Sequence, residues 1–294
     1  MAIYTLGRLL PDALSDIGVL KRGRASGGGV TSIVESGRVD ASNDESYAGG
    51  SAFILRDAGG AAALPEGQFS RITSYASATG TFTLTDTITA VASGDRYGVV
   101  SNVWPIDELI ELANDALQQL DIPAIDTSIT SADNQTEYTL PIALKQHDLL
   151  KVKFQGDTTD ANDNKWMSIH DWVIVPSTPG SAGTLILPQL PSGRTVQLWY
   201  SAKHPSLNAY SDVIAEVIDP RLARAALKER IRNKEAESTL SAASPQRRSW
   251  DKAKAELEEA RRNYPINIPK RGTRYTSISS DEYGYSFVPG RVRL

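Results

Sequence analysis

Apolar residues recur at two different periods along the chain, and the two periods alternate in blocks. A spacing of three and four residues places side chains on one face of a helix, and it occurs in four segments: 4–21, 106–120, 212–231 and 245–260. A spacing of two residues, typical of half-buried strands, dominates between 30 and 101 and again between 136 and 203. The pattern predicts a helix, a β block, a second helix, a second β block and a pair of helices.

Proline and glycine set the expected limits of these elements. Pro105 precedes the second helical segment, where Asp107 and Glu108 suit the helix dipole. Pro11 lies inside the first segment, so we expect the helix to start or kink there. The glycine-rich run at 24–29 is expected to end the first helical segment and to act as a flexible hinge.

Each β block is expected to hold five strands. In the first block they are predicted at 30–35, 51–56, 68–74, 81–86 and 95–101. In the second block they are predicted at 136–140, 148–155, 165–175, 183–187 and 194–203.

Short helices cannot bury an apolar face alone, so we expect the four helical segments to pack together. The predicted fold class is α+β, a helical bundle with two inserted antiparallel β domains and an extended C-terminal arm. The expected domains are an N-terminal bundle helix at 1–26, an inserted β barrel or sandwich at 27–102, a bundle helix at 103–126, a second β domain at 127–205, C-terminal bundle helices at 206–263 and a docking arm at 264–294.

Composition narrows the functional classes. The chain of 294 residues has no cysteine, which excludes disulfides, thiolate metal sites and cysteine nucleophiles. Its net charge of −4 is uneven, because residues 101–210 hold thirteen acidic and six basic side chains. A basic footprint along the whole sequence, typical of nucleic-acid-binding proteins, is missing. Apolar runs are too short to predict a membrane span.

The last thirty residues have no helical or strand period and combine proline, aromatic and basic side chains. Such a segment cannot bury enough of its own surface to offset its ordering entropy, so we expect it to order on a partner. The expected partner-binding residues of this arm are Lys270, Arg271, Arg274, Tyr275, Tyr283, Tyr285 and Phe287.

A second candidate partner surface is a row of cations on the penultimate helix. It consists of Arg221, Arg224, Lys228 and Arg232, whose spacings of three, four and four return to one side of the helix. A solvated stripe is the plainer interpretation, and the alternative is a docking surface for an acidic partner or passing nucleic acid.

Signals for catalysis or cofactor binding are weak. The three histidines, His147, His170 and His204, have no hydrolytic metal spacing and are assigned polar or packing roles. The run 160–164 with Asp171 imitates the start of a calcium loop but has Lys165 where glycine is required, so an Asx-rich connection is preferred. We therefore expect no enzyme activity, no catalytic residues, no cofactor and no metal.

Two further charged clusters have plain interpretations. Glu108 and Glu111 are the only carboxylates that could be nominated for acid–base catalysis, but neighbouring carboxylates on a solvated helix face have no cause for split pKa values. Lys21, Arg22 and Arg24 form a small basic cluster that is assigned to solubility.

Three segments in order resemble the head-to-tail adaptor (connector) proteins of tailed bacteriophages. Residues 104–110 (WPIDELI), continuing to Asn114, Ala116 and Leu117, resemble the helix that opens the bundle in that family. Residues 134–141 (NQTEYTLP) are similar to the strand entry that follows it. The segment 212–226, with Asp219-Pro220 and an alanine-rich run, also matches the pattern. The block at 30–101 departs from smaller members of the family.

The resemblance implies a structural virion protein of the neck. It would form a homo-oligomeric ring, commonly of twelve copies, that joins the portal protein to a tail nozzle, tube or neck protein and lets DNA pass without sequence-specific binding. Fibres are a further expected partner, and a membrane is not. The expected location is the virion, after synthesis in the host cytoplasm. The alternative is another tail, fibre or baseplate component with a carbohydrate- or protein-binding β domain.

Overall fold

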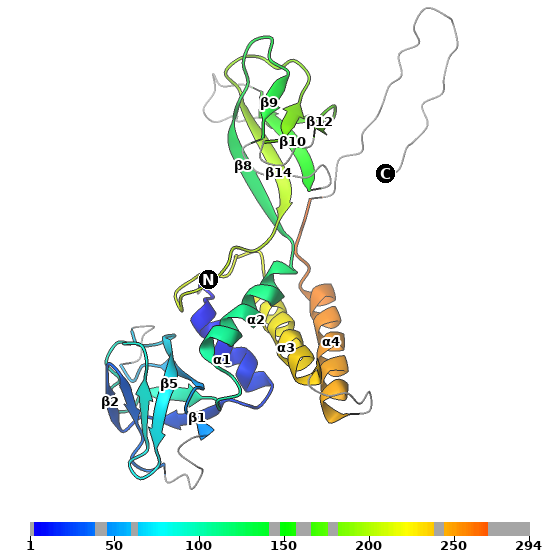
Figure 1. The fold of residues 1–294 in the computed structure, drawn as a ribbon. Helices are drawn as coiled ribbons and strands as arrows, with labels where there is room; N and C mark the ends of the chain where they lie inside the picture. The colour runs from blue at the N-terminus through cyan, green and yellow to red at the C-terminus, as the bar shows by residue number, and fades with distance from the viewer. Residues whose placement is uncertain are drawn as a thin grey trace, which may run out of the picture. The chain divides into compact units, whose positions relative to one another are not determined.

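The computed structural model describes most of the chain and divides it into two compact units (Figure 1). The described residues are 3–38, 46–59, 64–140, 148–156, 166–175, 182–237 and 244–269. The first unit combines Met1–Leu120 with Lys203–Ile266, and the second combines Asp121–Ala202 with Asn267–Leu294. No described helix is both long and apolar enough to cross a bilayer.

The fold class expected from the sequence is wrong. In place of a helical bundle with inserted β domains, the described residues form fourteen strands in three antiparallel sheets and only four helices. Two unexpected strands lie at 21–24, in the small basic cluster, and at 27–29, in the glycine-rich run that was expected to be a hinge. A third lies at 122–130, where no strand was expected. Short strands carry a weak sequence signal, whereas a helical stripe is conspicuous, so the helices were given too much weight.

The first sheet belongs to the first unit and has seven strands. Its order is β1 (Lys21–Arg24), β7 (Arg96–Val99), β4 (Ser51–Arg56), β5 (Phe69–Ala76), β6 (Thr81–Leu84), β3 (Ser32–Val34) and β2 (Gly27–Gly29). The edge strands β1 and β2 are separated by only two residues of chain. Two residues cannot span a flat sheet with strands about 4.8 Å apart, so the sheet must curl back on itself.

An aromatic core fills the inside of this curled sheet. Tyr47, Tyr75, Phe82 and Tyr97 are all at most 3% exposed, and the rings of Tyr75 and Phe82 stack with centroids 4.4 Å apart. Burial, followed by the hydrogen bond that its hydroxyl donates to Glu35, raises the pKa of Tyr97. The sheet therefore has its own core.

The glycine run does not act as a hinge. Gly27, Gly28 and Gly29 form β2 and pair with β3. A Cβ atom on Gly28 would lie 2.5 Å from the carbonyl oxygen of Ser32. A Cβ on Gly23, in β1, would lie 2.6 Å from the Tyr97 ring. These glycines permit close packing rather than freedom of movement.

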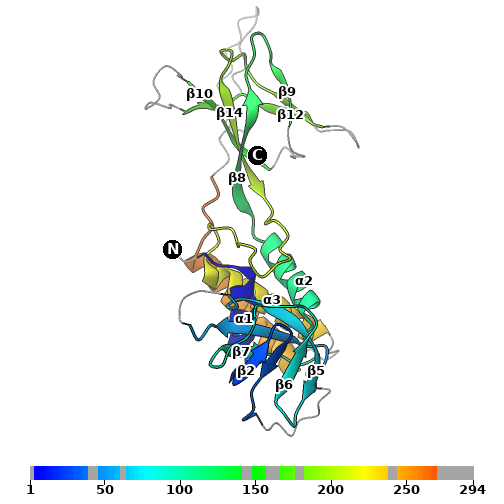
Figure 2. The same ribbon diagram turned by 90° about the vertical axis from the view of Figure 1, so that its left-hand side faces the viewer.

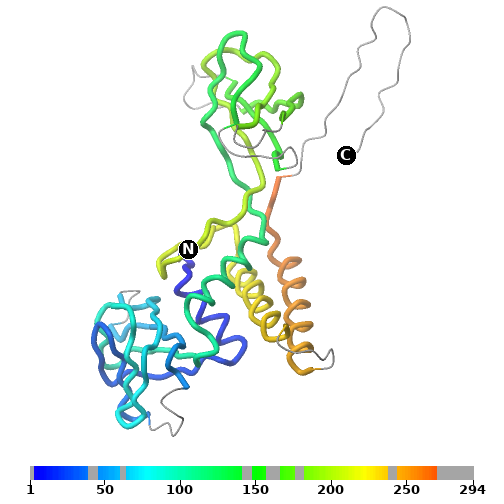
Figure 3. The backbone as a smooth tube through the Cα atoms, viewed as in Figure 1, coloured from blue at the N-terminus to red at the C-terminus, as the bar shows by residue number. Residues whose placement is uncertain are grey.

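Four helices complete the first unit: α1 (Leu6–Asp16), α2 (Ile106–Gln118), α3 (Pro220–Glu237) and α4 (Pro245–Asn263). Helix α3 contacts each of the other three and lies beside α2 and α4 in Figures 1 and 3. Its buried face is largely made of small and aliphatic side chains, which allow close approach: Leu222, Ala223, Ala226, Leu227 and Ile231. Of the two alternatives expected at Pro11, a helix start is wrong, since α1 begins five residues earlier and Pro11 lies inside it; a kink there stays a prediction.

The segment before α3 is a cap on α1 rather than a helix. Residues 212–218, which were expected to be helical, instead include an antiparallel bridge between Thr5 and Val213. The backbone N–H groups of Leu6 and Gly7 donate to the carbonyl oxygens of Asp212 and Tyr210, at 3.0 and 2.9 Å. The first turn of α1 therefore obtains acceptors for N–H groups that have no partner within the helix.

Side chains of the first sheet bond directly to the helical part of the same unit. The buried hydroxyl of Ser51 donates to the carbonyl oxygen of Trp104 at 2.7 Å, just before α2. The amide of Gln68 donates to the hydroxyl of Tyr210 at 3.2 Å, and the ring of Tyr210 packs edge-on against Phe69. This sheet and the helices form one packed unit.

The second unit consists of two smaller antiparallel sheets around one core (Figure 2). The four-stranded sheet has the order β11 (Trp166–Ile169), β10 (Leu149–Gln155), β14 (Thr195–Ala202) and β8 (Ile122–Thr130). The three-stranded sheet has the order β12 (Val173–Val175), β13 (Thr184–Ile186) and β9 (Glu137–Thr139). Both contribute to one cluster that includes Ile129, Tyr138, Val152 and Leu185.

Candidate functional site

The four cations expected to form a partner surface lie on α3, and each has a partner within the chain. At the start of the helix, the Arg221 guanidinium bonds to the hydroxyl of Tyr264 and lies 5.3 Å from the centre of its ring. That hydrogen bond, with the charge interaction it brings, raises the pKa of Arg221. The contact ties α3 to the residue that follows α4.

The next two cations of the row join α3 to neighbouring helices. Arg224 lies 3.7 Å from the carboxylate of Asp16, at the end of α1. Lys228 forms an ion pair with Glu256 of α4. Both pairs are partly exposed, so each contributes at most about 1 kcal/mol, and they link α3 to α1 and to α4.

The last cation caps the other end of α1. Arg232 pairs with Glu235 at 2.6 Å and donates to the carbonyl oxygen of Ile17 at 3.0 Å. Ile17 follows the last turn of α1, whose carbonyl groups lack partners within the helix. The row therefore has an intramolecular role, and its contact with a partner stays a prediction.

Two more polar contacts hold α3 in place. Lys234 pairs with Glu108 of α2, and the indole N–H of Trp250 on α4 donates to Glu229 at 2.7 Å. Glu108 is thus engaged in a helix–helix contact, while Glu111 is exposed to solvent. The described structure gives this pair of carboxylates no shared cleft suited to acid–base chemistry.

Several residues singled out from the sequence lie outside the described part of the chain. They are the seven arm residues Lys270, Arg271, Arg274, Tyr275, Tyr283, Tyr285 and Phe287, the candidate calcium run at 160–164, and His147. Within the described residues, no group of three or more His, Asp or Glu side chains is placed to hold a metal ion.

His204 has a structural role that its sequence position did not reveal. It is 3% exposed, and its Nε2 accepts from the backbone N–H of Ala215 at 3.0 Å. Nδ1 lies 2.6 Å from the carbonyl oxygen of Pro205, so it is Nδ1 that carries the proton and donates. The ring thereby links two parts of the segment between β14 and α3. His170 is exposed.

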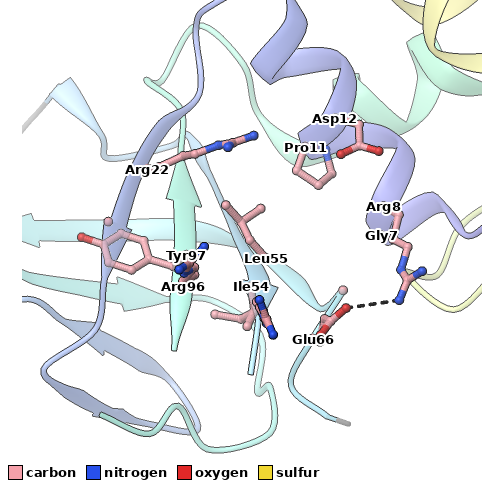
Figure 4. A pocket seen from close by; sticks show the side chains of 13 residues that line it. Gly7, Arg8, Pro11, Asp12, Arg22, Ile54, Leu55, Glu66, Arg96 and Tyr97 are labelled. Carbon is pink, nitrogen blue, oxygen red and sulfur yellow. Dashed lines mark hydrogen bonds and ion pairs between the residues drawn. The ribbon is translucent and has the colours of Figure 1, made fainter. Parts of the chain in front are cut away.

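A cavity of about 370 Å³ opens between α1 and the outer face of the first sheet (Figure 4). Four arginines line it, from α1, β1, β4 and β7: Arg8, Arg22, Arg56 and Arg96. Sequence reasoning found Arg22 and assigned it to solubility, but it missed the other three. Their proximity depends on strand pairing between distant segments, which leaves no local spacing to recognise.

Comparisons with known proteins do not identify a family for this chain. No protein-family model matches the chain, and no curated protein gives a significant match. The functional argument therefore rests on the residues and contacts described above.

Proposed function

We propose that this chain is a head-to-tail adaptor of a tailed bacteriophage, a structural virion protein whose copies form a ring between the portal and the tail. The observation that carries the proposal is the position of the three family-like segments in the fold. Pro105 immediately precedes α2, Tyr138 is the buried centre of β9, and Pro220 is the first residue of α3. The first two segments thus lead into or form an element of the expected type, whereas the third is helical only from Pro220 onward, and the three follow one another in the expected order.

An exposed apolar patch in the first unit supports a role as an assembly subunit. Ile3, Val213 and Val217 are 60%, 48% and 46% exposed. The bridge between Thr5 and Val213 places the segment that carries Ile3 beside Val213, and Val217 follows four residues later on the second segment. Grouped aliphatic side chains in water favour burial by another protein surface.

A closed ring needs two different surfaces on every copy, because its contacts are head-to-tail. Helix α2 supplies a surface unlike the apolar patch. Asp107, Glu111 and Asp115 are all exposed and recur every four residues, so they form one acidic stripe. We assign the patch and the stripe to ring contacts.

The carbohydrate-binding alternative finds less support. Recognition of sugars by the first β block requires exposed aromatic rings, and all six aromatic residues between 30 and 101 are buried or half-buried. Most of them form the core of the curled sheet instead.

Mass photometry of the purified chain, alone and with the portal protein of the virus that encodes it, tests the proposal. We expect a discrete complex in which the portal ring has gained a ring of this 31.8 kDa chain. Val217→Asp should abolish the complex while the protein stays folded. The control Val30→Asp changes an equally exposed valine in the turn between β2 and β3 and should retain the complex. A wild-type chain that leaves the mass of the portal unchanged refutes the proposal.

A further inference from the structure

Three arginines occupy paired positions on three neighbouring strands of the first sheet. Arg24 of β1 pairs with Arg96 of β7, and Arg56 of β4 pairs with the same Arg96. Paired residues in antiparallel strands project to one face with Cβ atoms about 5 Å apart, and like charges there destabilise the sheet. All three side chains are exposed. Arg22, two residues before Arg24, projects to the same face.

Two hollows adjoin this arginine row. The cavity of about 370 Å³ lies between the row and α1, and Figure 4 shows Arg22 extending from its strand toward Pro11 and Asp12 of the helix. A second hollow of about 260 Å³ is lined by Arg24 and Asp57. Arg56 and Arg96 line both hollows, so they are the centre of the cationic face.

The carboxylates at the walls of the two hollows already have partners. Glu66 pairs with Arg8 at 3.2 Å, Asp12 accepts from the hydroxyl of Tyr4 at 3.0 Å, and Asp57 accepts from the backbone N–H of Gly59 at 3.1 Å. Only Glu66 is paired with a cation, Arg8, and neither Asp12 nor Asp57 forms an ion pair with Arg56 or Arg96 in the described residues, so the arginines of the two hollows still outnumber the carboxylates.

The central arginines have no competing bonds. Across the described ranges, the side chains of Arg56 and Arg96 form no hydrogen bond or ion pair. The larger hollow is lined by four arginines and two carboxylates, an excess of two positive charges. A guanidinium has five N–H donors, so two unpaired arginines side by side can donate several hydrogen bonds to one multivalent anion.

We propose that this face binds phosphate groups, with Arg56 and Arg96 as the central ligands and with Arg22 and Arg24 of the neighbouring strand β1 beside them. A phosphate group carries up to two negative charges and three strong acceptor oxygens, so one group can bridge several guanidiniums. A carboxylate has one charge and two oxygens and matches a single arginine. The phosphates come either from a free diphosphate-type ligand or from a nucleic acid backbone. The proposal is independent of the adaptor function.

Isothermal titration calorimetry of the full chain with pyrophosphate tests this site. We expect saturable binding that weakens at least tenfold in Arg96→Gln and in Arg56→Gln. Arg71→Gln is the matched control, since Arg71 is an exposed arginine of β5 in the same sheet but lines neither hollow. It should bind as the wild type does. A second titration uses a DNA duplex of about twenty base pairs. Binding of this duplex with the same dependence on Arg56 and Arg96 identifies a nucleic acid backbone as the source of the phosphate groups.

Thermal unfolding provides a readout that separates binding from misfolding. Without ligand, Arg96→Gln removes like-charge repulsion and should raise the melting temperature by about 1–2 °C. Pyrophosphate should raise the melting temperature of the wild type and of Arg71→Gln, but not that of Arg96→Gln. The proposal is overturned if neither pyrophosphate nor the duplex binds, if Arg71→Gln weakens binding as much as Arg96→Gln does, or if only a glutamate-rich peptide binds.

Discussion

Gly7 of α1 lies directly against the backbone of Gly67, so closely that a Cβ atom on Gly7 would be 2.0 Å from the carbonyl oxygen of Gly67. The carbonyl oxygen of Tyr210 also lies close, 3.0 Å from the same Cβ position. Three segments that are distant in the sequence meet at this one point of the first unit. Only glycine leaves room for them.

Gly7→Ala should therefore destabilise the protein by about 3 kcal/mol, because backbone atoms rather than a flexible side chain must move. Gly27→Ala is the control: nothing lies within 4 Å of its Cβ position, and the change should stay within about 0.5 kcal/mol. Urea unfolding of the two variants measures the difference. Equal stabilities would show that the contact at Gly7 is not tight.

The ion pair between Lys228 and Glu256 can be tested by exchanging its charges. Lys228→Glu should lower stability by about 0.5–1 kcal/mol, because it sets two carboxylates against each other between α3 and α4. The double variant Lys228→Glu with Glu256→Lys should recover most of that loss, as measured by a double-mutant cycle in chemical denaturation. No recovery would mean that the pair does not contribute to the stability of the fold.

The loop that caps α1 should weaken in acid. The pKa of Asp212 is lowered from its ordinary value of 3.8 by hydrogen bonds from the backbone N–H groups of Asn208 and Ala209. A lowered native pKa means that the carboxylate stabilises the folded state above pH 3.8 and that this contribution is lost as the pH falls through the native pKa.

Asp212→Asn should accordingly cost less than about 1 kcal/mol at pH 7, since the group is close to solvent. The difference from the wild type should shrink below pH 3.8. Thermal melts across the acid range measure it. A difference that stays constant down to pH 2 would contradict the assignment.

Deletion of residues 270–294 tests the docking role of the C-terminal arm. The deletion retains Tyr264 and its contact with Arg221, so the described units should unfold at the same temperature as in the full chain. Association with the portal should be lost, because the expected aromatic anchors are removed. The measurement is co-sedimentation with portal rings. Undiminished co-sedimentation would place the docking surface elsewhere.

Local patterns predicted individual elements well. The strand expected at 51–56 is β4 with the same bounds, and Pro105 marks the start of α2. The buried side of α3, including Ala223 and Ile231, follows from its helical spacing alone. These features depend on neighbours within one or two turns, which a sequence displays directly.

Features that depend on distant neighbours were missed. Strand β8 contains Pro123 and alternates weakly, and its pairing with β14 joins residues about seventy positions apart. The glycines of β2 are needed for backbone approach, which no local rule separates from flexibility. The row of cations on α3 was predicted from the sequence. Its partners Asp16 and Glu256 were not predicted, because they lie on other helices.

The central proposal is that this chain is a neck subunit of a tailed phage, and cryo-electron microscopy of intact virions that contain the chain is the most direct test. The account predicts that the two described units fit density as a closed ring between portal and tail. Density for the chain only in fibres or a baseplate, or no density for it in the particle, would contradict the account.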